Sequence, residues 1–264
     1  MDIHVEEHCI RKKGEATQQH QSSLGERIQS GESLITLTSL LSKDETEYLS
    51  RLASAAATTQ RTNKSNNCTL DHTLQVCVVR MPTLAAASRE NSRGRAPVAG
   101  LPETLSLFLE EILERALIFI DQEICPSLKE TLFGKQKDGG VTSIAQLFLN
   151  NQLEYSRREP AVNVYSAPNG KFSMHKDCHA LTLLVPLSDP ILDFTGGGTA
   201  FWSQSSPTEG QHDPSLVMIP PAGTALLFGG CVSHKGLAIE TGTRVVFVVS
   251  FSRLGSKDNS YQIS

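Results

Sequence analysis

Short apolar segments separated by turn residues fill the second half of the chain, and they constrain its fold more than any other feature. From residue 161 onward the segments AVNVYS, ALTLLVPL, TAFW, SLVMIP, TALLFG and RVVFVVSF follow one another. Several short strands at such spacing predict a sandwich or barrel of antiparallel strands. The last segment is apolar at successive positions, which indicates a strand buried on both faces.

Helices are expected mostly before these strands. Ser42 and Glu45 form a capping-box pattern that predicts a helix through about Ala57. A long helix should begin at Pro102, because apolar residues follow at helical spacing. They are Leu105, Phe108, Leu109, Ile112, Ala116 and Ile120. Further strands are expected at 33–37 and 74–81. This order favours an α+β fold, a double-stranded β-helix (jelly-roll) core buttressed by N-terminal helices.

The 264 residues suffice for one sizeable core. Neither an internal repeat nor a second domain is indicated, so we expect a single domain over 32–256 with its jelly-roll core at about 160–253. Residues 1–31 are rich in Gln, Ser, Glu and Lys and poor in aromatic residues, which predicts a disordered arm. Residues 257–264 are expected to form a tail.

Composition excludes several classes of protein. Hydrophobic residues make up 39% and charged residues 20%, as in an ordinary soluble domain. The net charge of −4 gives no basic field, so a nucleic-acid partner is not expected. The six cysteines form no CxxC pair, which argues against a zinc site or a disulfide framework. Without a secretory signal or a long apolar segment, we expect a cytoplasmic or nuclear protein with no membrane contact.

Two histidines and an aspartate form the strongest chemical pattern. His175, Asp177 and His234 have the types and order of a set that binds one face of a non-haem Fe(II). Residues i and i+2 of an extended chain share a face, so the first two can reach one ion. His234 must come from a distant strand, which a jelly roll brings alongside. His179 and Cys178 are nearby alternatives, and the sequence leaves their contribution open.

Arg244 stands at the start of the apolar segment VVFVVSF. A buried strand that begins with an arginine requires an anion near it. The planar guanidinium suits a carboxylate, which it can bind through two parallel hydrogen bonds. A ligand carboxylate is favoured over an internal Asp or Glu.

Taken together, these segments resemble the core of the 2-oxoglutarate/Fe(II)-dependent dioxygenases, most closely the prolyl 4-hydroxylase-like branch. The matching segments are NVYSAPNGKFSMHKD, LTLLVPLSD, GGGTAFW and PAGTALLFGGCVSHKGLAIETGTRVVFVVSF, about a third of the chain. The resemblance implies that His175, Asp177 and His234 ligate iron as the catalytic set. It also implies that Arg244 holds the distal carboxylate of 2-oxoglutarate.

Two weaker site assignments come with this resemblance. It implies that Tyr165 hydrogen-bonds the co-substrate and that Thr182 lines the same pocket. The implied reaction is hydroxylation of a C–H bond, coupled to decarboxylation of 2-oxoglutarate to succinate. Fe(II), 2-oxoglutarate and O2 are the implied cofactors, with ascorbate as a further candidate. The substrate is expected to be a protein or amino acid, with a prolyl or other amino-acid side chain as the reacting group.

Two alternatives remain open at this point. Asn163-Val-Tyr165 and FGGCVSHKGLAI also resemble AlkB-like nucleic-acid demethylases, but those carry a second arginine where Ser250 stands here. A non-catalytic jelly-roll module, or a cupin-like metal-binding protein, is the other alternative. Cupins usually supply more histidines and need no equivalent of Arg244. O2-dependent succinate formation from 2-oxoglutarate distinguishes an enzyme from such a module.

Overall fold

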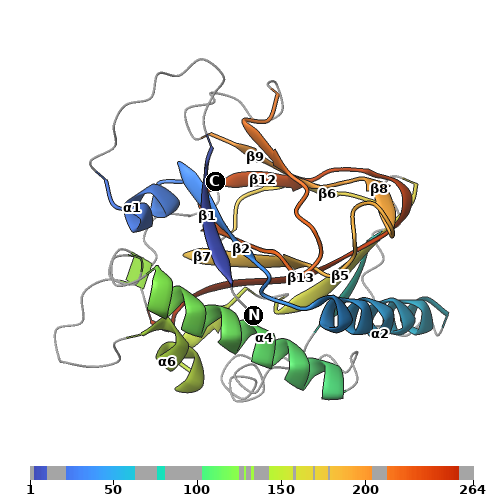
Figure 1. Cartoon of the computed structure of the whole chain (residues 1–264), viewed down its shortest axis with the longest axis horizontal. Helices are drawn as coiled ribbons and strands as arrows, with labels where there is room; N and C mark the ends of the chain where they lie inside the picture. The colour runs from blue at the N-terminus through green and yellow to red at the C-terminus, as the bar shows by residue number, and fades with distance from the viewer. Residues whose placement is uncertain are drawn as a thin grey trace.

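Two antiparallel β-sheets face each other, and helices cover the outer side of the larger sheet (Figure 1). The computed structural model describes residues 3–10, 22–62, 76–80, 103–124, 128, 132–133, 143–156, 159–168, 170–177, 179–203 and 213–255. The expected tail at 257–264 lies outside these residues, and the expected domain boundaries stay a prediction.

Eight strands form the core, and the chain alternates between the sheets except at β9 and β10, which are paired in the smaller sheet. The centre of the larger sheet has the order β5-β13-β7-β11, and the smaller sheet has the order β6-β12-β9-β10. This arrangement is a jelly roll, which confirms the predicted double-stranded β-helix. The strands are β5 (Ala161–Ser166), β6 (Phe172–His175), β7 (Leu181–Pro186), β9 (Thr199–Trp202), β10 (Leu216–Met218), β11 (Ala225–Gly229), β12 (Ser233–Gly236) and β13 (Ile239–Arg253).

Further strands extend the larger sheet on both sides. At one side β2 pairs with β11 and β1 pairs with β2, while at the other side β3 pairs with β5. Two short strands, β4 and β8, pair with β13. Their bounds are β1 (His4–Cys9), β2 (Ser33–Thr38), β3 (Val76–Arg80), β4 (Leu153–Tyr155) and β8 (Phe194–Gly196).

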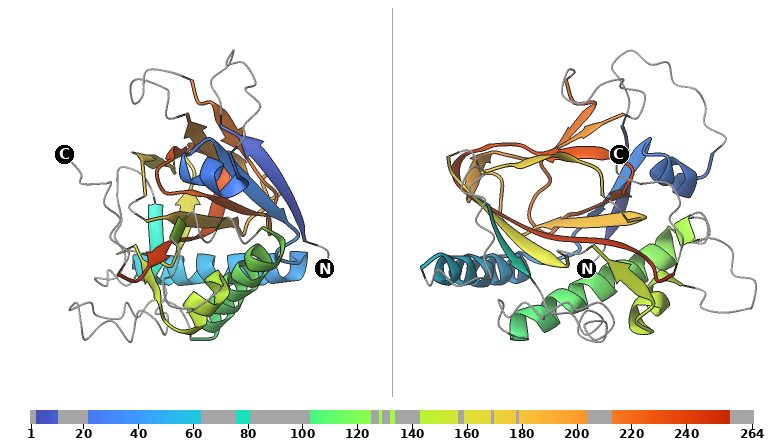
Figure 2. Two further views of the ribbon diagram at one scale, coloured as in Figure 1. Left: turned by 90° about the vertical axis from the view of Figure 1, so that its left-hand side faces the viewer. Right: turned by 180° about the vertical axis from the view of Figure 1, so that it is seen from behind.

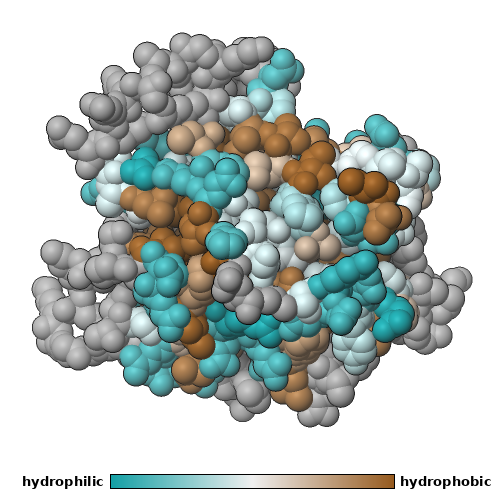
Figure 3. All heavy atoms as spheres, in the orientation of Figure 1, coloured by the Kyte–Doolittle hydropathy of each residue, from teal (hydrophilic) through white to brown (hydrophobic). Residues whose placement is uncertain are grey.

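Helices α2, α4 and α6 pack beneath the larger sheet, on the side away from the smaller one (Figures 1 and 2). Hydrophilic side chains predominate over α2 on its outward face (Figure 3). Within the described ranges, no helix has the length and apolar character needed to cross a bilayer. The helices are α1 (Leu24–Gln29), α2 (Lys43–Thr62), α4 (Glu103–Glu123) and α6 (Ile144–Leu149).

Strand β13 separates two hydrophobic cores, because its side chains point alternately to opposite faces. Val245 and Phe247 belong to the core between the larger sheet and the helices. Val246 belongs to the core between the two sheets. This confirms a strand buried on both faces. Arg244 and Ser250 share the inner face with Val246, so their side chains point toward the smaller sheet.

The predicted helix starts and apolar faces are confirmed where side chains are described. The Ser42 N–H donates to Glu45 Oε2 over 2.8 Å, and the Glu45 N–H donates to Ser42 Oγ over 3.2 Å. Arg115 of α4 donates to Glu45 Oε1 over 2.9 Å and so ties α2 to α4. The predicted face of α4 is buried at Leu109, Ile112, Ala116 and Ile120. The side chain of Leu105 lies outside the described residues.

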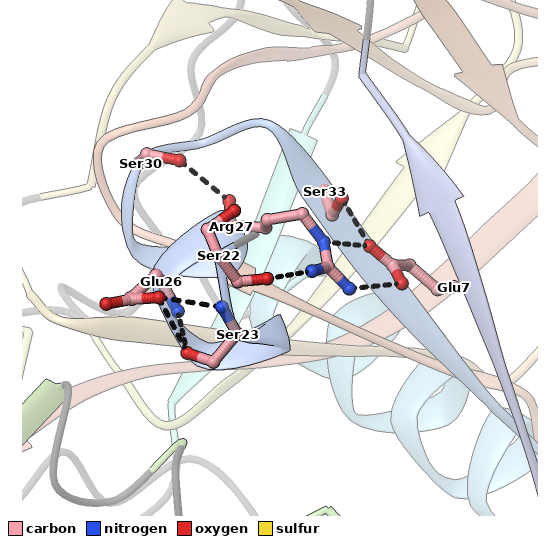
Figure 4. A network of polar contacts seen from close by, with 7 residues as sticks. All are labelled: Glu7, Ser22, Ser23, Glu26, Arg27, Ser30 and Ser33. Atoms are coloured by element: carbon pink, nitrogen blue, oxygen red, sulfur yellow. Dashed lines mark hydrogen bonds and ion pairs between the residues drawn. The ribbon is translucent and has the colours of Figure 1, made fainter. Parts of the chain in front are cut away.

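Two stretches of the segment 1–31, which we expected to be a disordered arm, are ordered elements, while residues 1–2 and 11–21 lie outside the described residues. Residues 4–9 form β1, and residues 24–29 form α1. Arg27 joins the two elements, because its Nε and Nη2 each donate to the Glu7 carboxylate over 2.8 Å (Figure 4). Ser33 Oγ of β2 donates to the same carboxylate over 2.6 Å. Two parallel charge-assisted N–H bonds therefore link helix α1 to strand β1, and the Ser33 contact links the same carboxylate to β2.

Candidate metal centre and adjoining cavity

The fold brings the three predicted metal ligands together. His234 on β12 lies directly opposite His175 on β6 in the smaller sheet, and Asp177 follows β6. His175 Nε2 is 3.4 Å from Asp177 Oδ1, and His234 Nε2 is 3.7 Å from Asp177 Oδ2. One ligand atom from each residue lies within 4.8 Å of the others. Two ligands about 2.1 Å from one ion and at right angles are about 3 Å apart, and the two separations from Asp177 are close to that value.

Both imidazole rings are fixed in the orientation that metal binding requires. His175 Nδ1 lies 2.8 Å from the Ser173 carbonyl oxygen, and His234 Nδ1 lies 3.0 Å from the Val232 carbonyl oxygen. A carbonyl can only accept, so each Nδ1 carries the proton and donates it. Each Nε2 then keeps its lone pair on the side facing Asp177, as in metal sites where a second contact sets the tautomer.

Aromatic side chains seal the inner side of His234. The Phe228 ring lies 4.9 Å from the imidazole of His234, and the Phe201 ring lies 6.1 Å from it, centroid to centroid. Both phenylalanines are fully buried in the core between the sheets. The dry wall that these rings form restricts the movement of the imidazole and keeps water from its inner face.

Gly230 holds the backbone of Asp177 beside the strand that carries His234. The Asp177 N–H donates to the Gly230 carbonyl over 2.9 Å, and the Gly230 N–H donates to the Ala180 carbonyl over 3.2 Å. A Cβ at Gly230 would lie 1.8 Å from the His179 carbonyl oxygen, which no side chain can tolerate. Glycine is required here by close backbone approach.

Thr182 supports the carboxylate of Asp177. Its hydroxyl donates to Asp177 Oδ2 over 2.5 Å, and the Ser250 hydroxyl lies 3.0 Å from the same Thr182 oxygen. The Thr182 side chain is fully buried and is not among the residues that line the cavity next to the triad. Its position therefore differs from the pocket lining that the resemblance implied, and it fits a group that orients a metal ligand.

The charges of the triad suit a divalent cation. Burial opposes ionisation of Asp177, but the hydrogen bond to His175 and the charge of His234 outweigh it and lower its pKa to about 2. Burial lowers the pKa of His234 below its ordinary value. The pKa of His175 is raised despite its burial, because the Asp177 carboxylate, 3.4 Å from Nε2, stabilises the protonated imidazole. A divalent cation at this site would replace the proton that Asp177 favours on His175 Nε2, and the set would then offer it an ionised carboxylate and two imidazole nitrogens.

A cavity of about 470 Å³, its open mouth included, adjoins the three ligands. Arg244 and Tyr165 line it, and they lie opposite each other on the paired strands β13 and β5. The Arg244 guanidinium lies 5.6 Å from the centre of the Tyr165 ring. The structure thus places two predicted co-substrate residues in the same cavity as the triad. Two imidazoles and a carboxylate on one side, with open space on the other, fit an Fe(II) centre.

Arg244 is buried but has no carboxylate partner among the residues described. Its Nη1 donates to the Gly198 carbonyl over 2.9 Å, and its Nη2 donates to Thr199 Oγ1 over 3.0 Å. Burial lowers its pKa from the ordinary value, and the neighbouring Tyr165 opposes that shift. Only 4% of the residue is exposed, so the charge is held at the cavity wall without a counter-ion from the described chain. A guanidinium so placed is suited to an anionic ligand.

Sequence reasoning missed two polar residues of the cavity. Glu159 precedes β5, and Asn163 lies on β5 two residues before Tyr165. Period-two alternation could have placed Asn163 beside Tyr165, but nothing local marks Glu159. Of the two open ligand candidates, His179 is not in the cluster of converging donors, and Cys178 lies outside the described residues.

Comparison with known proteins gave matches among solved structures. No family model and no curated protein matches the chain. A 2OG-Fe(II) oxygenase family oxidoreductase from Burkholderia pseudomallei is 15% identical, with a TM-score of 0.46 over 87% of this chain and 88% of that one. The viral collagen prolyl hydroxylase of Paramecium bursaria Chlorella virus-1 is 15% identical, with a TM-score of 0.47 over 86% and 98%. A Pseudomonas putida prolyl-4-hydroxylase is 15% identical, with a TM-score of 0.47 over 84% and 93%.

Proposed function

We propose that this chain is an Fe(II)- and 2-oxoglutarate-dependent dioxygenase. The reaction hydroxylates a C–H bond of a second substrate and converts 2-oxoglutarate and O2 to succinate and CO2. One observation carries the proposal: His175, Asp177 and His234 converge at a cavity that also contains the buried cation Arg244. An amino acid, free or within a peptide, is the proposed substrate, with a prolyl or other side chain as the group hydroxylated.

The three ligands would hold Fe(II) on one face and leave its remaining positions open toward the cavity. Bound there, Fe(II) supplies the activation of O2 and the oxidising step. Carbonyls that accept from both Nδ1 atoms keep the imidazoles in the tautomer that binds metal. Thr182 orients the Asp177 carboxylate toward the two rings.

Arg244 would bind the distal carboxylate of 2-oxoglutarate, a role that its burial and its missing counter-ion support. Tyr165, beside it on β5, would donate its hydroxyl hydrogen to the same co-substrate. Val246 lines the cavity directly opposite Asn163, two residues along β13 from Arg244, and would keep water from the chain of the bound dicarboxylate. The positive charge of Arg244 would therefore fix which end of the co-substrate points away from the metal.

Succinate formation tests the proposal. Protein loaded anaerobically with Fe(II) and 2-oxoglutarate, with ascorbate as a reductant, should form succinate and CO2 in equal amounts after O2 is added. Mixtures of free amino acids and peptides should accelerate that turnover. Protein that binds neither Mn(II) nor 2-oxoglutarate and forms no succinate under these conditions would sink the proposal in favour of a non-catalytic jelly-roll module.

The nucleic-acid demethylase alternative gains no support from the cavity. Ser250 occupies the position of the second arginine, and its hydroxyl contacts Thr182. The carboxylate of Glu159 lines the cavity beside Ser250, and its negative charge would repel a phosphate there.

A further inference from the structure

The turn between β11 and β12, residues 229–232, holds two of the predicted metal ligands through its backbone. The Gly230 carbonyl accepts from the Asp177 N–H over 2.9 Å. The Val232 carbonyl accepts from His234 Nδ1 over 3.0 Å. These two bonds fix the backbone of one ligand and the imidazole ring of the other. The position of this turn therefore decides where two of the three ligands lie.

The other two residues of the turn contact helix α1. A Cβ on Gly229 would lie 2.3 Å from the Ile28 carbonyl oxygen, so the backbone of α1 lies directly against the end of β11. Cys231 Sγ donates to the Gln29 carbonyl over 2.9 Å, and the cysteine is buried. Ile28 is fully buried in the core between the larger sheet and the helices. Along residues 229–232, contacts with α1 thus alternate with contacts to the metal ligands.

Helix α1 is held in this place by strand β1. Arg27 Nε and Nη2 each donate to the Glu7 carboxylate over 2.8 Å, and Arg27 Nη1 donates to the Ser22 carbonyl over 2.5 Å (Figure 4). The side chains of Arg27 and Glu7 are 18% and 31% exposed, so water screens the pair only in part. A helix of six residues has little stability by itself. Its place therefore depends on this ion pair and on the burial of Ile28.

The contact between α1 and the turn would transmit a displacement to the metal ligands. It joins backbone to backbone at Gly229, and no flexible side chain lies between them to absorb a shift. Metal sites tolerate displacements of only about 0.5 Å in their ligands. Groups that orient the ligands typically change metal affinity by about 10–100-fold when they are lost.

We propose that α1, held by the pair of Arg27 and Glu7, is a positioning element of the metal centre. It fixes residues 229–232 and through them Asp177 and His234, and it contacts neither the metal nor a substrate. Release of α1 from β1 lowers the affinity for the metal, so attachment of the N-terminal segment controls how much metal the centre holds. This inference rests on the proposed function, because it requires the triad to bind a divalent cation.

Mn(II) titration of the full chain by calorimetry tests the inference without requiring turnover. Arg27→Ala removes the pair with Glu7, and we expect Mn(II) to bind about tenfold more weakly. Arg115→Ala is the matched control, because Arg115 donates to Glu45 over 2.9 Å and ties α2 to α4 on the outer side of the larger sheet. Both variants lose an ion pair between two elements, but only Arg27→Ala should lose metal affinity. Urea unfolding measures the stability of both variants.

A double-mutant cycle assigns the effect to the ion pair. Glu7→Gln should lower the Mn(II) affinity in the same direction as Arg27→Ala, and the double variant should lose no more than the larger single loss. Arg27→Lys keeps the charge and should recover part of the affinity. The affinity for 2-oxoglutarate at saturating Mn(II) should stay near the wild-type value, because Arg244 lies on β13 and contacts Gly198 and Thr199.

Three outcomes would overturn the inference. Wild-type protein and Arg27→Ala could bind Mn(II) equally well, or Arg115→Ala could weaken Mn(II) as much as Arg27→Ala, which would assign the loss to stability alone. Wild-type protein that binds no Mn(II) would remove the proposed function at the same time, so the two failures are distinguished by the first titration. If Arg27→Ala does not fold, the milder Glu7→Gln and Arg27→Lys variants decide between these outcomes.

Discussion

His175 and His234 form a cross-strand pair in the smaller sheet, with ring centroids 4.3 Å apart. Each ring donates through Nδ1 to the carbonyl two residues before it, so the same kind of local hydrogen bond fixes both imidazoles. The pair therefore presents two nitrogen ligands in a fixed relation before any metal arrives. Such preorganisation lowers the cost of binding a cation.

Replacing His234 by alanine should abolish tight metal binding. The variant removes one of three ligands, and we expect the affinity for Mn(II) or Fe(II) to fall by about 100-fold or more. Calorimetric titration of the metal-free protein measures this. His4→Ala is the control, because His4 is exposed on β1. Equal metal affinities in the two variants would contradict the assignment.

Replacing Arg244 by glutamine should weaken 2-oxoglutarate far more than metal. Truncating a buried charged contact costs about 2–5 kcal/mol, which predicts a rise of roughly two orders of magnitude in the KM for 2-oxoglutarate. The Mn(II) affinity, measured without co-substrate, should change little because Arg244 contacts Gly198 and Thr199 rather than the triad. An unchanged KM for 2-oxoglutarate would exclude the proposed role.

Replacing Thr182 by valine distinguishes two roles for this residue. If Thr182 orients Asp177, the variant loses a hydrogen bond to a metal ligand, and metal affinity should fall about 10–100-fold. If Thr182 instead contacts the co-substrate, the KM for 2-oxoglutarate should rise while metal affinity stays constant. Ser250→Ala, which keeps the bond from Thr182 to Asp177, should have the smaller effect on metal affinity.

Stability of the metal-free protein should depend on pH through Glu159. Its pKa is raised from 4.5 to about 7, so the folded chain keeps a proton that the unfolded chain releases in this range. That contribution is fully present below pH 4.5 and is lost as the pH rises through 7. Urea unfolding at pH 5 and pH 8 should show that Glu159→Gln recovers up to about 3 kcal/mol at the higher pH. The same pH dependence in Glu159→Gln as in the wild type would refute this origin.

Replacing Gly230 by alanine should damage the metal centre through the backbone. The new Cβ would meet the His179 carbonyl, so the segment must move and the bond from the Asp177 N–H to Gly230 must lengthen. We expect a loss of roughly 1–3 kcal/mol in the free energy of unfolding and weaker Mn(II) binding. Thermal unfolding and metal titration of the same sample measure both. A variant as stable as the wild type, with full metal affinity, would show that the segment can relax.

The jelly roll and the placement of the triad could be predicted because both depend on strong local patterns. Alternating apolar segments specify the strands, and the spacing of His175 and Asp177 follows from the period of an extended chain. The partners that orient these ligands could not be predicted. Ser250 reaches Thr182 only because β7 and β13 are paired, and Glu159 meets a backbone N–H that is 91 residues away in sequence.

The N-terminal segment shows why polar composition misled the prediction. His4–Cys9 is mostly exposed, with both faces of the strand turned to solvent. Composition reports how much apolar surface a segment can bury, and this segment buries little. Pairing with β2 and the contact between Glu7 and Arg27 hold it in place instead. Backbone hydrogen bonds and an ion pair of this kind cannot be predicted from a hydrophobicity pattern.

Strand β2, with the sequence SLITLT, is almost wholly buried. Without β1 it would be an exposed edge strand of the larger sheet, with unpaired backbone N–H and C=O groups that can pair with another chain. Strand β1 pairs with this edge of β2 and becomes the edge strand itself, and it carries Glu6, Glu7 and two histidines. A charged border resists pairing with another chain. A protein shortened by its first ten residues should therefore self-associate at concentrations where the full chain stays dispersed.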